Sequence, residues 1–305
     1  NGVGKTRMLR HMSRALVLKS ARPSEVGRFV AEDATDSDAL FANLVSVTFS
    51  AFDPFEALPE VRDASAGIRY AYIGLQRDRT KAKKSPIPKT VRTLRKEFVE
   101  SGRACRAGAE LDRWRSALET LETDPLFKDA EVTALAYRSS DAQWEEAAPK
   151  LFERLSSGHK VVLLTITRLV QTVDERTLVL LDEPEAHLHP PLLSAFVRAL
   201  SNLLIQRNGV AIIATHSPVV LQEVPRTCVW KLRRTGAEAR AERPQIETFG
   251  ENVGVLTREV FGLEATDSGF HKMLRQAVHT APDYASVKER FHAQLGGEAQ
   301  AIVRA

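Results

Sequence analysis

Two adjacent acids, Asp182 and Glu183, are the residues of this chain whose types and position most plainly suggest chemistry. They follow an apolar run at residues 178–181 that has the length and composition of a buried strand. A strand that ends in this way delivers two carboxylates to one edge of a sheet, where they repel each other unless a cation offsets their charge. The pair therefore predicts a site for a cation, and with it a phosphate cradle that a metal ion can bridge.

The first six residues, N-G-V-G-K-T, fit the back half of the phosphate-binding loop G-x-x-x-x-G-K-[ST]. In that loop, glycines let backbone N–H groups close around phosphate oxygens while the lysine reaches the outer phosphates. Apolar residues at helical spacing follow, which places the loop at a helix N-terminus that favours an anion. An ordinary glycine-rich turn is the alternative, and the downstream acids favour the phosphate loop. The predicted loop residues are Asn1, Gly2, Val3, Gly4, Lys5 and Thr6.

The pattern's first glycine would precede residue 1, so we expect the chain to be truncated at its N-terminus within this motif.

The pattern of hydrophobic residues predicts the strands and the helix that must position the two acids. Strands are predicted at 44–49, 70–75 and 210–214, and an amphipathic helix at 192–204. Strand, helix and strand in this order form a βαβ unit, whose parallel strands end at the same sheet edge. His216, which follows the strand at 210–214, is therefore expected near Asp182 and Glu183.

A long apolar stretch at 161–173 predicts a buried helix, and Ser156 and Gly158 stand at its start. A hydroxyl and free N–H groups at a helix start suit an anion, although an ordinary serine N-cap is the alternative.

Gln76, just after the strand at 70–75, is a candidate metal ligand. A single glutamine at this position is at least as consistent with a plain solvent-facing residue.

With 305 residues, 43% of them hydrophobic, the chain can bury a large core. Two distant cysteines offer neither a disulfide framework nor a metal-ligand pair, and no apolar run reaches the length of about 20 residues that spans a bilayer. We therefore expect a soluble, cytoplasmic protein with no membrane partner. One domain over residues 1–305 is predicted, with a basic helical insertion at about 77–150 and a helical C-terminal extension at about 233–305.

The stretch from Arg69 to Arg115 holds 14 Lys or Arg residues against 5 Asp or Glu, in a chain whose net charge is only +4. Such an excess is typical of a surface that contacts nucleic-acid phosphates. The stretch lacks interleaved aromatic residues, which slightly favours the other interpretation, a solvated helical lobe.

Four motifs in order, N-G-V-G-K-T, L-S-S-G-H, L-V-L-L-D-E-P and A-T-H-S, resemble the ABC-type ATPases, in particular the soluble RecF-like and SMC-like branch of the AAA family. Ser156 precedes Asp182 by 26 residues and His216 follows it by 34, as in that family. The resemblance implies an α/β P-loop NTPase with a mostly parallel sheet flanked by helices. The sequence departs from the family at L-S-S-G-H, which stands where L-S-G-G-Q is usual.

The resemblance also implies ATP and Mg²⁺ as cofactors. Lys5 and the loop backbone would hold the phosphates, and the metal ligands would be Thr6, Asp182 and Gln76. Glu183 would orient and activate the attacking water. His216 would contact the γ-phosphate.

Ser156, Gly158 and His189 would contact a nucleotide held by a second subunit, so the functional unit would be a homodimer or higher homo-oligomer closed on ATP. His187 and His189 alternatively form an H-x-H metal pair, but the sequence offers no third ligand nearby.

The segment from Glu247 to Glu264 resembles the C-terminal region of PtuA, the ATPase subunit of Septu-type anti-phage systems. This resemblance implies a separate HNH-type nuclease partner and a role in defence, consistent with the lack of a D-x-D motif beyond residue 220. The alternative is a RecF-like repair or recombination ATPase that binds DNA directly. The insertion is too short for an SMC coiled coil, and the L-H-P segment disfavours a transporter ATPase.

Overall fold

The computed structural model describes residues 3–30, 40–50, 58–61, 68–76, 88–138, 140–236, 238–261, 269–281 and 283–304. The chain forms two compact units, Asn1–Val220 and Leu221–Ala305. The sequence suggested one domain with an extension from about residue 233, whereas the second compact unit starts twelve residues earlier in the structure.

A four-stranded parallel sheet lies at the centre of the first unit, in the order β2-β1-β3-β4. The predicted strands are confirmed within one or two residues. Their bounds are Asn43–Thr48 for β1, Arg69–Gly74 for β2, Thr177–Asp182 for β3 and Val210–Ala214 for β4. Because all four strands run in the same direction, their carboxyl ends meet at one edge, as the βαβ pattern predicted.

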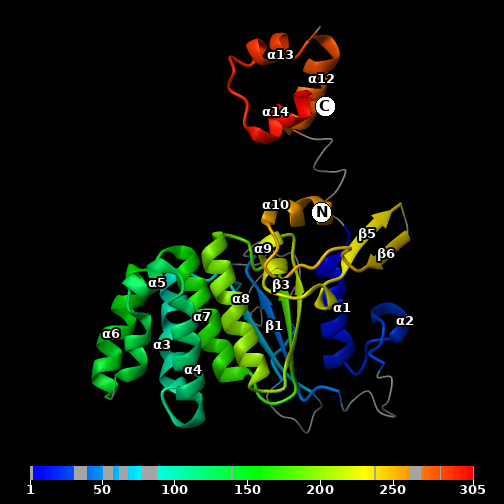
Figure 1. Cartoon of the computed structure of the whole chain (residues 1–305). Helices are drawn as coiled ribbons and strands as arrows, with labels where there is room; N and C mark the ends of the chain where they lie inside the picture. Colours follow the sequence, from blue (N-terminus) through cyan, green and yellow to red (C-terminus); the bar gives the residue numbers. More distant parts are fainter. Residues whose placement is uncertain are drawn as a thin grey trace. The chain divides into compact units, whose positions relative to one another are not determined.

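Helices cover both faces of this sheet (Figure 1). On one face, Leu178 and Leu180 pack with residues of α1 (Lys5–Val17). On the other face, Val179 and Leu181 pack with the larger group of helices. The strand residues alternate between two hydrophobic layers because successive strand side chains point to opposite faces. The fold is therefore the α/β P-loop NTPase type that the motifs predicted.

The predicted insertion is a helical lobe packed around two buried tryptophans. Trp114 and Trp144 are fully buried and meet edge to face, with ring centroids 5.7 Å apart. Trp114 Nε1 also donates a hydrogen bond of 3.0 Å to Thr167 Oγ1 on α7, which joins the lobe to that helix. The elements of the lobe are α3 (Val91–Cys105), α4 (Gly108–Leu121), α5 (Pro125–Asp129), η3 (Val132–Tyr137) and α6 (Asp141–Arg154), and the helix that follows them is α7 (Ser157–Thr172).

Helix α8 (Pro190–Ile205) connects β3 to β4 and completes the βαβ unit. The apolar stretch at 161–173 forms most of α7, as predicted. A short helix, α2 (Pro23–Val26), follows α1. Its proline stands at the first helical position, where a missing N–H costs nothing.

The second unit begins within α9 (Pro218–Gln222) and carries a two-stranded antiparallel sheet. Cys228 ends a 3-10 turn, and the first strand of this sheet, β5, runs over Lys231–Thr235. The other elements are η4 (Arg226–Cys228), β6 (Glu238–Glu242), α10 (Val253–Phe261), α12 (Gly269–Thr280), α13 (Tyr284–Arg290) and α14 (Gly297–Arg304). None of the helices in the described part of the chain has both the length and the apolar character needed to cross a bilayer.

Candidate functional site

The described part of the predicted phosphate loop, residues 3–6, leads directly into helix α1. Gly4 is the N-cap of α1 and has a left-handed backbone with φ of 91°, which glycine adopts without strain. Lys5 and Thr6 occupy the first turn, so the unpaired N–H groups of a 13-residue helix lie beside their side chains. Asn1 and Gly2, also predicted for this loop, lie outside the described residues.

The two acids stand where the strand pattern placed them. Asp182 is the last residue of β3 and lies beside Ala214, the last residue of β4. Glu183 follows with a left-handed backbone, φ of 44°, and its N–H donates a hydrogen bond of 2.8 Å to Ala214 O. A non-glycine residue in this conformation is uncommon and clusters at functional sites. It turns the chain sharply away from the sheet at the second acid.

Lys5 and His216 bring the loop and the sheet edge together. Lys5 Nζ lies 2.7 Å from His216 Nε2, and Glu183 Oε1 lies 3.8 Å from the same nitrogen. The predicted arrival of His216 near the acids is thus confirmed for Glu183. Lys5, from the N-terminal loop, joins a cluster built from residues more than 170 positions away.

Burial and neighbouring charges both shift the pKa values of Lys5 and His216 in this cluster. Burial lowers the pKa of Lys5, while Glu183, Glu185 and Asp182 act in the opposite direction and favour its ammonium form. Burial also lowers the pKa of His216, and the neighbouring Lys5 charge lowers it further. Both effects on the pKa of His216 favour the neutral imidazole, the form in which a ring nitrogen can accept a hydrogen bond from the Lys5 ammonium.

Glu185 is a member of the site that the sequence did not single out. Its carboxylate accepts a hydrogen bond of 2.8 Å from Thr215 Oγ1 and another from the backbone N–H of His216. These two bonds fix the turn that follows β4, and they therefore hold His216 toward Lys5. The third acid of D-E-P-E was the available signal, since it lies two residues beyond Glu183.

Gln76 lies two residues beyond β2, at the same carboxyl edge of the sheet, and is only 6% exposed. It is therefore not the solvent-facing residue of the alternative interpretation. Strand β1 separates β2 from β3 in the sheet, and the role of Gln76 as a magnesium ligand stays a prediction.

Ser156 and Gly158 stand at the start of α7. Ser156 is the exposed N-cap, whose Oγ accepts the backbone N–H of His159 and lies 2.6 Å from His159 Nδ1. Gly158 is buried, and a Cβ there would lie 3.0 Å from the carbonyl oxygen of His187. The serine cap is thus confirmed. The glycine allows the loop after β3 to approach α7 closely.

His189 is the N-cap of α8, where its Nδ1 accepts the N–H of Leu192 at 3.5 Å. Its Nε2 faces Asp124, 3.7 Å from Oδ2, and the imidazole lies beside that of His159. His187 is exposed and has a left-handed backbone. The structure therefore does not bring His187 and His189 together as a metal pair, because His189 lies with Asp124 and His159 in a group that does not include His187.

The basic stretch is largely neutralised where the structure describes it. Eight of the nine described Lys and Arg residues between 69 and 115 lie within 4.0 Å of a carboxylate, while five further basic residues, at 77–84, lie outside the described part. DNA contact through this stretch stays a prediction, with less free charge to support it. The pairs are Arg69–Asp174, Lys89–Glu97, Arg95–Glu153, Lys96–Glu100, Arg103–Glu145, Arg106–Asp141, Arg113–Glu110 and Arg115–Asp112.

Residues 117–222 match the protein family described as "AAA domain, putative AbiEii toxin, Type IV TA system". The matched range takes in Ser156, Asp182 and His216, so this part of the chain is similar to that AAA domain. The chain is also 43% identical, over 325 aligned positions, to Protein ea59 of Escherichia phage lambda. That alignment covers 100% of the chain and 61% of the phage protein, so the chain spans about three fifths of the relative's length.

Proposed function

We propose that the chain binds ATP with Mg²⁺ and hydrolyses it at the cluster of Lys5, Asp182, Glu183 and His216. The observation that carries this proposal is the approach of Lys5 Nζ to within 2.7 Å of His216 at the carboxyl edge of the sheet. An ammonium group at a helix N-terminus suits phosphate oxygens, and the neighbouring hydroxyl and carboxylates suit a hard divalent cation. The residues present therefore fit both groups.

Each residue of the cluster has a distinct part in the proposed reaction. Lys5 and the first-turn N–H groups of α1 bind the outer phosphates, while Thr6 and Asp182 hold the metal. Mg²⁺, when bound, neutralises charge on the phosphates. Glu183 accepts a proton from the attacking water and orients it. His216, whose backbone N–H donates to Glu185, contacts the γ-phosphate.

We further propose that two copies close head to tail on two nucleotides. Ser156 supports this because it is an exposed residue at the N-terminus of a 16-residue helix, whose first N–H groups have no intrahelical partner and favour an anion. In the closed dimer, Ser156 and Gly158 of each copy contact the nucleotide bound by the other.

Ser156→Arg tests the dimer. The wild-type chain is expected to double its mass in light scattering when Mg²⁺ and a slowly hydrolysed ATP analogue are added, whereas Ser156→Arg stays monomeric because the long charged side chain occupies the interface. The variant keeps nucleotide binding, since Lys5 and the acids are intact. Ser140→Arg is the matched control, because Ser140 is also an exposed N-cap serine, on α6. If Ser156→Arg dimerises as readily as the Ser140→Arg control, Ser156 does not contact the nucleotide held by the second copy.

The dimer is proposed to control a separate HNH-type nuclease in anti-phage defence. The support is the sequence of the segment at 247–264, together with the absence of a D-x-D motif beyond residue 220. An adjacent gene for such a nuclease would favour this role. Neighbouring recombination genes would favour the RecF-like alternative. That alternative requires direct DNA binding, and the basic residues of α3 and α4 support it less because most of them are paired with acids.

A further inference from the structure

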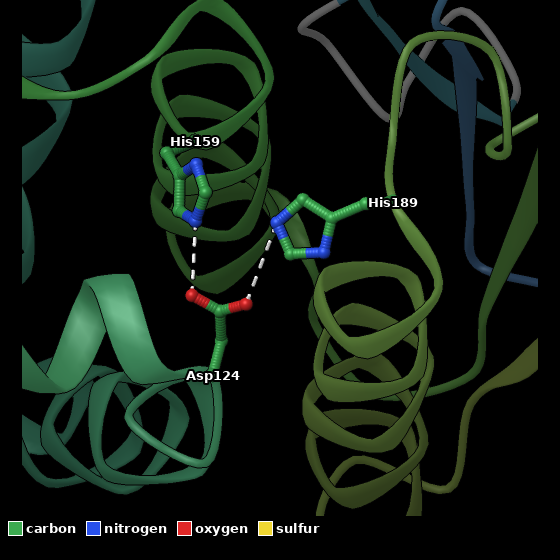
Figure 2. A group of neighbouring side chains, drawn as sticks. All are labelled: Asp124, His159 and His189. Carbon is green, nitrogen blue, oxygen red and sulfur yellow. Dashed lines mark hydrogen bonds and ion pairs between the residues drawn. The ribbon is translucent and has the colours of Figure 1, made fainter.

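Asp124, His159 and His189 converge from three separate elements of the first unit (Figure 2). Asp124 is the N-cap of α5, His159 lies in the first turn of α7, and His189 is the N-cap of α8. One ligand atom from each of the three side chains lies within 4.8 Å of the other two. The proposed ATPase reaction uses neither Asp124 nor His159, so the convergence calls for its own explanation.

The two oxygens of the Asp124 carboxylate have different surroundings. Oδ1 accepts three hydrogen bonds, from the backbone N–H groups of Leu126 and Phe127 and from His159 Nε2 at 2.9 Å. Oδ2 is buried and has no hydrogen-bond donor among the described residues, with His189 Nε2 at 3.7 Å. Leaving a buried carboxylate oxygen without a donor is unfavourable, because its lost hydration is not replaced. A cation beside Oδ2 would remove that cost.

The donor set selects the class of cation. Two imidazoles and one carboxylate are typical ligands of Zn²⁺ and of other first-row divalent ions, whereas Mg²⁺ and Ca²⁺ prefer oxygen alone. Asp124 is 0% exposed and His159 1%, but the His189 side chain is 46% exposed. The exposed His189 side chain therefore gives an ion a path from solvent to the buried Asp124 and His159.

We propose that Asp124, His159 and His189 form a binding site for a divalent transition-metal ion such as Zn²⁺. Supporting contacts already orient the ligands, as is usual around protein-bound metals. Two backbone N–H groups hold Asp124, and Ser156 Oγ lies 2.6 Å from the second ring nitrogen of His159. A hydrogen bond between Asp124 and His159 accounts for the surroundings of Oδ1. It does not explain why Oδ2 is buried without a donor from any residue that the structure describes, or why the imidazole of His189 faces it.

Ion binding shifts protons on both rings. An ion at His159 Nε2 moves the ring proton to Nδ1, which then donates to Ser156 Oγ. At His189 the proton likewise moves to Nδ1, so the long contact from Leu192 N–H is given up. The Ser156 hydroxyl hydrogen is then free to point away from α7, toward the second copy's nucleotide. This last consequence rests on the proposed function, whereas ion binding itself does not.

Calorimetric titration of the chelator-treated protein with Zn²⁺, without nucleotide, tests the site. The wild type is expected to bind one equivalent, and His189→Ser to bind at least about tenfold more weakly. Serine removes the imidazole but keeps a favourable helix N-cap. The control is His187→Asn, which removes a nearby exposed imidazole at a left-handed position that asparagine tolerates.

Full stoichiometric binding by His187→Asn together with weak binding by His189→Ser would support the site. Absence of stoichiometric Zn²⁺ binding by the wild type, or equal affinity in the wild type and His189→Ser, would overturn it. Because no nucleotide is present, failure here leaves the ATPase proposal untouched, and failure of ATP binding leaves this result interpretable.

Discussion

Glu183→Gln is expected to bind Mg·ATP about as tightly as the wild type while releasing phosphate about 10² to 10⁴ times more slowly. The amide has the shape of the carboxylate, so it preserves packing, but it cannot accept a proton from water. The Glu183 side chain is 44% exposed, which leaves its carboxylate accessible to an attacking water. Single-turnover phosphate release, measured beside nucleotide titration, separates the chemical step from binding.

Glu175→Gln is the matched control, because Glu175 is exposed and lies just before the opposite, amino end of β3. It should leave both phosphate release and affinity unchanged. Equal phosphate release by Glu183→Gln and the wild type would remove Glu183 from the role of base.

Trp114→Ala is expected to lower the free energy of unfolding by about 3–5 kcal/mol. The substitution empties a fully buried ring position against Trp144 and leaves the Thr167 hydroxyl without its indole partner. Because Thr167 lies on α7, the helix that carries Ser156, loosening this contact should also weaken nucleotide-dependent dimerisation. Chemical denaturation followed by circular dichroism measures the stability change.

Tyr137→Ala, in the same helical lobe, removes an aromatic ring that is 65% exposed and should change stability little. Comparable losses for the two variants would show that the Trp114–Trp144 contact does not organise the lobe.

The sequence predicted the sheet and the acid-histidine edge because short apolar runs and βαβ order determine them locally. Strand β4 was predicted with its observed bounds, and Asp182 at the end of β3 brought Glu183 to the correct edge. The N-cap at Ser156, which the sequence offered as the alternative to an anion site, is present in the structure, because a serine before an apolar helix can accept a first-turn N–H.

The Asp124 cluster was not predictable in the same way. Its members belong to three elements whose approach depends on helix packing, and no spacing in the sequence joins Asp124 to His159 or His189. Asp124 itself reads as an ordinary cap before a proline.

The neutralisation of the basic stretch could not be predicted for a similar reason, because it too depends on helix packing. Several of the partner acids, including Asp141, Glu145 and Glu153, come from α6, outside the stretch whose charge was counted. Charge counted along a sequence window therefore overstated the charge that this surface presents.

The central claim is that residues 3–6 and the edge formed by Asp182, Glu183 and His216 are one nucleotide site. Titration of Mg·ATP against the wild type and Lys5→Ala tests it most directly, with Lys19→Ala, at an exposed lysine just beyond α1, as control. Saturable binding by the wild type and the control, with affinity reduced at least about tenfold in Lys5→Ala, is the predicted result. Equal affinity in all three proteins would contradict the claim.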